Sequence, residues 1–190
     1  MTLFDYVRAH RHQLKEENIR ELFLRILRTI ESLHEQGIIL RDLDANGILI
    51  NKGSREGDTV PRLICLQSAE IMSLSSTTSG LVGDVRFRPP EVIKLKPYGF
   101  KADSWSLGVI FYFMLMNDLP FQGNLMEEEE ESESSSSMTS QSPVGGEVDI
   151  IAKIEADIET KQLDMLPLKQ QGTSNAAIDL LLKLLNRNEQ

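Results

Sequence analysis

The segment from Asp103 to Asn117 contains ten consecutive residues, Leu107 to Met116, whose only polar group is the hydroxyl of Tyr112. A helix needs about 20 apolar residues to cross a bilayer, so this run is too short to span a membrane. A short helix that is apolar on every face belongs at the centre of a globular core. At the start of this helix, Asp103 is suited either to cap the first turn or to hold a neighbouring loop.

Length and charge limit the function classes. A chain of 190 residues predicts one domain or slightly more, with a sizeable core. It carries 20 basic and 29 acidic residues, a net charge of −9, but six of the acids lie in one run between Glu127 and Glu133. The remainder is close to neutral and contains no basic patch, so we expect no nucleic-acid partner.

The cysteine and the N-terminus indicate the compartment. The single cysteine, Cys65, cannot form an internal disulfide, and no Cys and His residues have the spacing of a zinc site. The N-terminal segment lacks the charged and apolar regions of a signal peptide. These features predict a soluble intracellular protein, cytoplasmic or nuclear, that does not associate with membranes.

The first half of the chain predicts helices and small strands. Apolar periodicity indicates a long helix from Lys15, which Gly37 ends as the residue after its C-cap. A shorter helix is expected at Leu3–Ala9, and a one-turn helix at Glu91–Leu95 with Pro90 in its first position. Short apolar runs rich in β-branched residues predict three strands, at Ile38–Leu40, Ile48–Ile50 and Leu63–Leu66.

Residues 122–147 form an acidic, Ser-rich segment that ends in Pro and Gly. They offer almost no apolar area to offset the entropy lost on ordering, so we predict a disordered surface insertion within the domain. Order is expected to return with a helix whose apolar face runs from Val148 to Ile158. A last helix should begin at Ser174, which can cap its first turn.

Local strings carry a resemblance to a known family. In chain order they are Leu40-Arg41-Asp42-Leu43, Gly83 to Glu91 (ending in Pro89-Pro90-Glu91), Asp103-Ser104-Trp105-Ser106-Leu107-Gly108 and Leu119-Pro120-Phe121. The first resembles the H-R-D-L catalytic loop of protein kinases, and the second resembles the end of the kinase activation segment with its A-P-E. The last two are similar to the opening of the buried central helix of the family and to the turn after it.

The resemblance implies a mainly α fold over residues 1–190: the large lobe of a protein kinase, with a buried central helix and a few short strands at the catalytic-loop end. The kinase small lobe, with its Gly-rich loop and strand lysine, would lie before Met1. The arginine that pairs with the A-P-E glutamate in the family would fall just past Gln190, which would leave Glu91 without that partner. We therefore expect a large lobe alone or a fragment of a longer protein.

The same resemblance assigns the catalytic positions. Asp42 stands at the position of the catalytic base, with Arg41 beside it. The catalytic-loop asparagine that holds one Mg²⁺ corresponds to Gly47, which has no side chain, and Asn46 would serve only if the loop shifted by one residue. The metal-binding aspartate of D-F-G corresponds to Cys65, and a neutral thiol is a poor ligand for a hard cation. Both magnesium ligands are therefore expected to be missing.

Two further positions change the charge of the site. Asp44 replaces the lysine that steadies the transferred phosphate in Ser/Thr kinases, and Asp84 replaces its partner threonine. Two carboxylates are expected to repel a triphosphate where an enzyme would stabilise it. We therefore expect the protein to use no cofactor, with ATP and Mg²⁺ entering only if it is an active kinase.

Residues that define the fold are retained. Asp103 is expected to hold the backbone of the catalytic loop, and Trp105 is expected to pack in the core. Leu40 and Leu66 replace the His and Phe that stack on the central helix in active kinases, and both are apolar residues able to fill the same column.

Retained architecture with lost chemistry predicts a pseudokinase, a catalytically inactive module that serves a protein partner as an interaction or regulatory scaffold. A related reading is the kinase non-catalytic C-lobe family, whose members consist of this lobe alone and bind peptides. The alternative is a fragment of an ATP-dependent Ser/Thr protein kinase, which Arg41 and Asp42 support.

One Ser- and Thr-rich segment is a candidate for modification. Phosphates attached there would lie in the kinase activation segment, where Arg41 would pair with them; the candidate residues are Ser75, Ser76, Thr77 and Thr78. The other interpretation, which we favour, is a solvated surface loop. His34 shows no evident site and is expected at the edge of the apolar stripe of the long helix.

Overall fold

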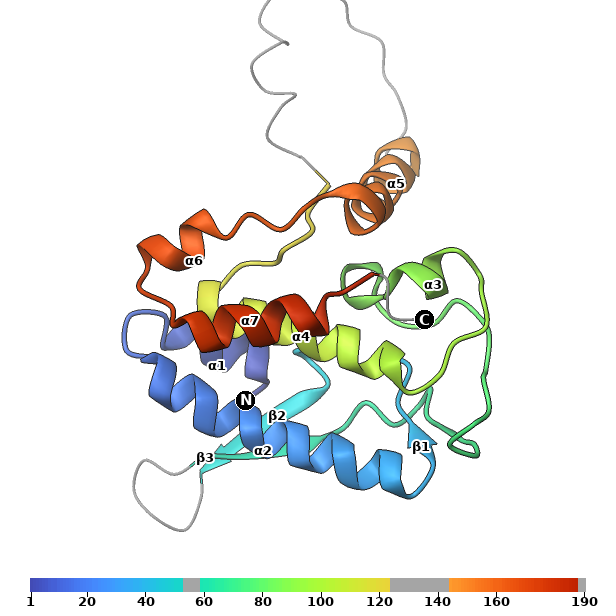
Figure 1. The fold of residues 1–190 in the computed structure, drawn as a ribbon, viewed down its shortest axis with the longest axis horizontal. Coiled ribbons are helices and arrows are strands. Elements are labelled where there is room, and N and C mark those ends of the chain that lie inside the picture. The colour runs from blue at the N-terminus through green and yellow to red at the C-terminus, as the bar shows by residue number, and fades with distance from the viewer. Residues whose placement is uncertain (53–58, 124–143, 188–190) are drawn as a thin grey trace, which may run out of the picture.

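Helix α4 (Lys101–Met116) lies at the centre of the fold, as its apolar run predicts (Figure 1). The computed structural model describes residues 1–52, 59–123 and 144–187, without the side chains of residues 52 and 144–148. Most side chains of α4 are buried on all faces of the helix, among them those of Trp105, Ile110 and Met114. Helix α7 (Asn175–Leu184) packs directly on α4, where a Cβ atom on Gly108 would lie 2.8 Å from a methyl carbon of Leu185.

The two N-terminal helices have the predicted positions. Helix α1 is Leu3–Ala9 and helix α2 is Glu16–Glu35, whose apolar side faces α4 through the stacked rings of Phe23 and Phe111, with centroids 4.4 Å apart. Gly37 follows the C-cap of α2 with φ +76°, a conformation that glycine adopts without steric cost. These helices bring the chain to the start of the catalytic-loop string.

Two small antiparallel sheets lie beside α2. Strand β1 (Ile38–Ile39) pairs with β4 (Glu70–Ile71), and β2 (Ile48–Lys52) pairs with β3 (Thr59–Leu63). The predicted strand at Leu63–Leu66 is therefore wrong in position. Pairing of β2 continues past its apolar residues to Lys52, so its partner strand starts in the polar segment at Thr59 and ends at Leu63.

Short helices complete the fold. They are η1 (Val85–Phe87), α3 (Pro90–Ile93), which has Pro90 at its start, and α6 (Leu166–Gln170). Ser174 caps α7 as predicted, because its hydroxyl accepts a hydrogen bond from the backbone N–H of Ala177 at 3.2 Å. The architecture is the mainly α large lobe that the sequence predicts.

Helix α5 (Val144–Thr160) begins inside the range of the predicted insertion. Residues 144–147 are helical, so the helix begins before residue 147, the predicted end of the insertion. The rest of the predicted insertion, at residues 124–143, lies outside the described residues. Among the helices that are described, none is long and apolar enough to cross a membrane.

Candidate functional site

Asp103 holds the catalytic loop by its backbone. Its carboxylate is 1% exposed and accepts hydrogen bonds from the N–H groups of Leu40 and Arg41, each at 2.9 Å. Helix α4 starts at Lys101 and Phe100 at its N-cap makes no side-chain cap, so the carboxylate does not cap the helix. Of the two roles suggested by the sequence, Asp103 therefore has that of tying down a loop. It fixes Arg41 at φ +67°, where non-glycine residues rarely occur.

His34 belongs to this arrangement, although the sequence indicated no site for it. Its Nε2 atom lies 2.7 Å from Oδ2 of Asp103, and its ring packs at 4.9 Å from the ring of Phe100. The signal available in the sequence was the position of a histidine in the last turn of a helix that leads directly into the loop. The carboxylate that holds the loop is thus itself contacted by a side chain of α2.

Asp42, at the position of the catalytic base, lies against the activation segment. A Cβ atom on Gly83 would be only 2.8 Å from Oδ1 of Asp42, and Gly83 has φ +81°. The segment is fixed there because the guanidinium of Arg88 donates to the carbonyls of Val82, at 3.0 Å, and Gly83. The hydroxyl of Ser106 donates to the carbonyl of Phe87 at 2.9 Å.

The two positions assigned to magnesium ligands touch each other. A Cβ atom on Gly47 would lie 2.6 Å from Cβ and 2.8 Å from Sγ of Cys65, closer than real carbon contacts allow. The N–H of Gly47 donates to Oδ1 of Asp44 at 2.5 Å, so the backbone also turns toward that carboxylate. Asn46, the alternative ligand, is exposed. The thiol of Cys65 therefore occupies the space that an asparagine side chain would need.

Asp44 is close enough to two other carboxylates, those of Asp42 and Asp84, for their charges to affect it. Burial raises the pKa of Asp44, and the negative charges of Asp42 and Asp84 raise it further. Burial alone would raise the pKa of Asp84, but hydrogen bonds from Arg86 and its positive charge outweigh that and lower the pKa. Arg86 thus forms an ion pair with one of the two carboxylates expected to repel a triphosphate.

The thiol of Cys65 is a weak acid in this setting. Burial raises its pKa to about 11, and the charges of Asp44 and Asp42 act in the same direction. The thiol is therefore neutral at pH 7, and a neutral thiol does not bind hard cations.

We expect the alkylation rate of Cys65 by iodoacetamide to rise about tenfold per pH unit between pH 8 and pH 10, because only the thiolate reacts. A cysteine in a solvent-exposed peptide levels off above a pKa of about 8.5. The measurement is a pH series of alkylation followed by mass spectrometry of the intact protein. The Asp44→Asn variant should react faster at pH 8, and a plateau below pH 9 in the unmodified protein would contradict the assignment.

The apolar column predicted beside α4 is only half present. Leu40 is fully buried, whereas Leu66 is 54% exposed. The backbone turns immediately after β3, where the N–H of Leu66 donates to the carbonyl of Ile64 at 3.0 Å. The expectation that Leu66 fills the column is therefore wrong.

Arg41 is surrounded by groups that the sequence did not single out. Its guanidinium donates to Oε2 of Glu70 at 2.8 Å, to the hydroxyl of Tyr98 at 3.0 Å and to the carbonyl of Ser79 at 3.0 Å. The hydroxyl of Thr78 donates to the same oxygen of Glu70 at 2.7 Å. We call Arg41, Glu70, Thr78 and Tyr98 the Arg41 cluster. Of the candidate phosphorylation sites, only Thr78 belongs to it; the exposed ones are Ser75, Ser76 and Thr77.

Two further residues with expected structural roles are Trp105 and Glu91. Trp105 is buried and stacks on Phe121, with ring centroids 5.8 Å apart. Glu91 lies in α3 and is partly buried, and its backbone carbonyl accepts a hydrogen bond from the N–H of Lys96 at 2.9 Å. Helix α3, which carries Glu91, packs on α5.

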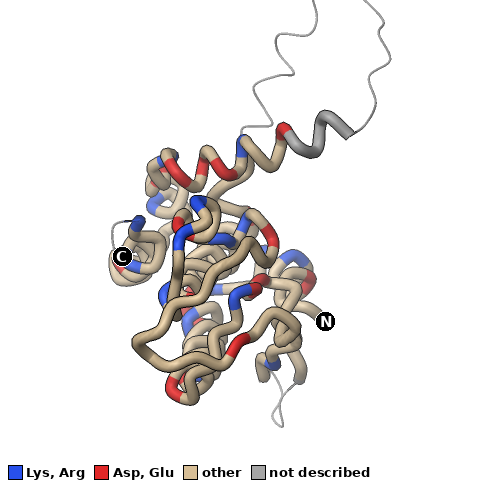
Figure 2. The backbone as a smooth tube through the Cα atoms, turned by 90° about the vertical axis from the view of Figure 1, so that its right-hand side faces the viewer, with Lys and Arg blue, Asp and Glu red and all other residues tan. Residues whose placement is uncertain are grey.

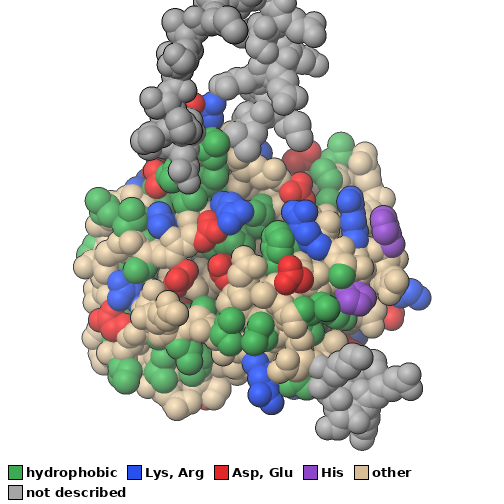
Figure 3. Space-filling view, turned by 180° about the vertical axis from the view of Figure 1, so that it is seen from behind, with side chains coloured by type: hydrophobic (Ala, Val, Ile, Leu, Met, Phe, Trp, Pro, Cys, Tyr) green, Lys and Arg blue, Asp and Glu red, His purple; other side chains and the backbone are tan. Residues whose placement is uncertain are grey.

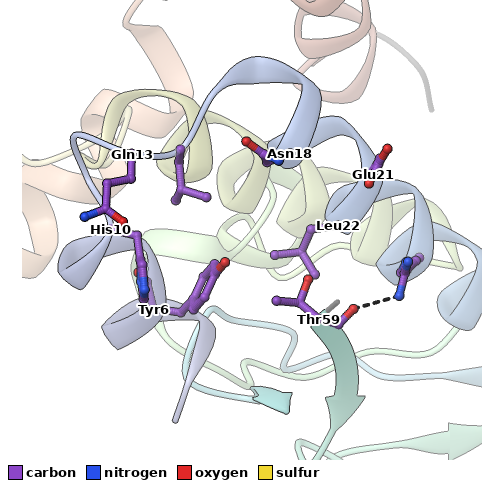
Figure 4. Close-up of a pocket in the computed structure, with 9 residues that line it drawn as sticks. Tyr6, His10, Gln13, Asn18, Glu21, Leu22 and Thr59 are labelled. Carbon is purple, nitrogen blue, oxygen red and sulfur yellow. Dashed lines mark hydrogen bonds between the residues drawn. The ribbon is translucent and has the colours of Figure 1, made fainter. Parts of the chain in front are cut away.

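A separate pocket lies between α1, α2 and β3 (Figure 4). Polar side chains make up most of its lining, and Arg25 donates to the carbonyl of Thr59 at 2.8 Å across its edge. The catalytic-loop residues 41–47 do not line it. Acidic and basic positions are interspersed along the backbone in Figure 2 rather than gathered by sign.

Comparison with known proteins gives one family. The protein kinase domain family matches residues 1–190. Serine/threonine/tyrosine-protein kinase HT1 of Arabidopsis thaliana is 36% identical over 112 residues, covering 59% of this chain and 27% of that protein. Serine/threonine-protein kinase nekl-2 of Caenorhabditis elegans is 28% identical over 138 residues, covering 73% and 37%. Serine/threonine-protein kinase Nek10 of Homo sapiens is 33% identical over 125 residues, covering 65% and 10%. The chain thus spans well under two thirds of the length of these relatives.

Proposed function

The chain belongs to the protein kinase family, and from this premise we propose that it is a catalytically inactive member that acts as an interaction or regulatory scaffold for another protein. The observation that carries the proposal is the contact between Gly47 and Cys65. The two positions that should present oxygen atoms to Mg²⁺ instead pack a thiol against a bare backbone, with no room for a side chain on Gly47.

The residues present do not fit Mg²⁺ with a nucleotide. Gly47 has no coordinating atom, and Cys65 carries a neutral thiol because its pKa is raised to about 11. Asp44 stands where the family has a lysine, and its carboxylate is engaged by the N–H of Gly47. No phosphate-transfer step is therefore assigned to Asp42, although it keeps the position of the base.

The retained architecture supports a role that depends on shape. Asp103 still fixes the loop through two backbone hydrogen bonds, although the loop lacks the metal ligands it would present in an enzyme. A fold kept without its chemistry is suited to presenting surfaces to other molecules.

Apolar surface is available near the loop. Ile64 and Leu66 are exposed beside the catalytic-loop end of the fold, where large apolar side chains favour association. A groove between α2 and α4 is lined by Leu27, Ile30, Leu74, Phe100 and Leu107, with Glu31, His34 and Glu35 also contributing. Figure 3 shows apolar side chains reaching one face of the molecule in several groups between charged ones.

We expect no Mg²⁺-dependent stabilisation by ATP. A ligand present at 100 times its Kd raises the free energy of unfolding by about 2.7 kcal/mol, which is easily resolved in a melting curve. The protein should therefore melt at the same temperature with and without millimolar ATP and Mg²⁺. An active kinase carrying both magnesium ligands serves as the positive control.

The alternative function is that of a Ser/Thr protein kinase, as in the relatives named above. It requires a Mg²⁺-dependent rise in melting temperature together with transfer of radiolabelled phosphate to a peptide. Transfer that disappears in the Asp42→Asn variant would establish that function and exclude the inactive one.

A further inference from the structure

The Arg41 cluster holds the first part of the activation segment by charge and hydrogen bonds. The side chain of Arg41 is 16% exposed and donates to three acceptors. Glu70 and Ser79 lie near the two ends of residues 70–80, and Tyr98 lies just before α4. The ring of Tyr98 also lies under the guanidinium, 5.9 Å from its central carbon. Three of the five N–H groups of the guanidinium are thus used within the chain.

Backbone pairing positions both Glu70 and Thr78 in the cluster. Strand β4 pairs with β1 so that Glu70 stands opposite Ile39, two residues before Arg41. Thr78 forms an isolated bridge with Tyr98, with N–H to carbonyl distances of 2.8 and 2.9 Å in the two directions. Oε2 of Glu70 then accepts from both Arg41 and Thr78, which closes residues 70–80 into a loop anchored at both ends.

We propose that the carboxylate of Glu70 takes the place on Arg41 that a phosphate would otherwise occupy, so that residues 70–80 are fixed without phosphorylation, and that phosphorylation of Thr78 releases them. The ordering of residues 70–80 by Glu70 does not require a nucleotide, so its test is independent of whether the protein binds one.

The charge balance determines the direction of this effect. In the unmodified protein one guanidinium faces one carboxylate, and Thr78 contributes a neutral hydroxyl donor. A phosphate carries a charge of about −1.5 to −2 at pH 7 and donates no hydrogen bond when fully ionised. Attached to Oγ1 of Thr78, which lies 2.7 Å from Oε2 of Glu70, it would replace an attraction with a repulsion between two anions that share one cation.

The test is a four-way comparison of amide hydrogen exchange at residues 70–80. The 190-residue protein and its Glu70→Ala variant are each prepared with threonine or phosphothreonine at position 78. Phosphorylation should speed exchange about tenfold in the unmodified background, because an anion is placed against Glu70. In Glu70→Ala it should slow exchange by a similar factor, because the phosphate can then occupy the vacated place on Arg41.

Matched controls separate this effect from general loosening. Phosphoserine at position 75, which is exposed, should change exchange in neither background. Amides of α4 report whether each variant is folded, and Glu70→Gln supplies a second, isosteric removal of the charge. Exchange that is unchanged or slowed by phosphothreonine 78 in the unmodified background would overturn the proposal, because the phosphate would then have displaced Glu70 without opening the segment.

Discussion

Replacing Asp103 with alanine is expected to lower the free energy of unfolding by about 3–5 kcal/mol, the largest loss from any single change in the site. The carboxylate is buried and accepts from the backbone N–H groups of Leu40 and Arg41 and from the ring of His34. Alanine would leave two backbone donors without their acceptor in a region closed to water. It would also free Arg41 from the restraint that keeps it at φ +67°.

The measurement is thermal unfolding followed by circular dichroism. For a chain of this size, a loss of that magnitude corresponds to a fall of about 10 °C in Tm. Asp179→Ala is the matched control, because that carboxylate is exposed and pairs with Lys183 within α7, so Tm should not change. Asp103→Asn should lie between the two, since one amide oxygen can still accept. An Asp103→Ala variant that melts within about 2 °C of the unmodified protein would show that the loop does not depend on this carboxylate.

The elements that the sequence predicted well are those determined by local chemistry. The apolar run identified α4, the periodic stripe identified α2, and Gly37 and Ser174 marked helix ends through preferences that act within one turn. The apolar run alone left the role of Asp103 open between a cap and a loop anchor, and the family resemblance predicted the anchor. The sequence does not show the exact first residue of the helix. In the structure α4 begins at Lys101, two residues before Asp103, so Asp103 is not its N-cap.

The features that the sequence missed depend on pairings between distant segments. Glu70 meets Arg41 only because two-residue strands β1 and β4 pair, and strands this short carry no periodic signal. Leu66 was expected to be buried because it is apolar, but a turn after β3 leaves it exposed. The substitutions at Gly47 and Cys65 were visible in the sequence, whereas their contact with each other was not.

That contact also explains why single reversions are not expected to rebuild the metal site. A ligand atom at Gly47 has to displace the thiol of Cys65, and a carboxylate at Cys65 would join those of Asp44 and Asp42. Each change therefore meets an obstacle set by another residue. We infer that several side chains packed together, and not one substitution, block the positions assigned to the magnesium ligands.

We accordingly expect Gly47→Asn to lower the free energy of unfolding by up to about 3 kcal/mol, because the new side chain overpacks against Cys65. Removing the side chain of Cys65 should restore part of this stability. The variant with both Gly47→Asn and Cys65→Gly should be about 1–2 kcal/mol more stable than the sum of the two single effects predicts. Urea unfolding of the two single variants, the double variant and the unmodified protein measures this coupling.

Asn46 provides the matched control for this double-mutant cycle of Gly47 and Cys65, since it is the residue next to Gly47 and its side chain is exposed. Asn46→Ala should change stability by less than about 0.5 kcal/mol and should not couple to Cys65→Gly. If Gly47→Asn proves as stable as the unmodified protein, the thiol does not fill the space of the missing asparagine. The position would then be open to a ligand, and the main support for an inactive scaffold would be lost.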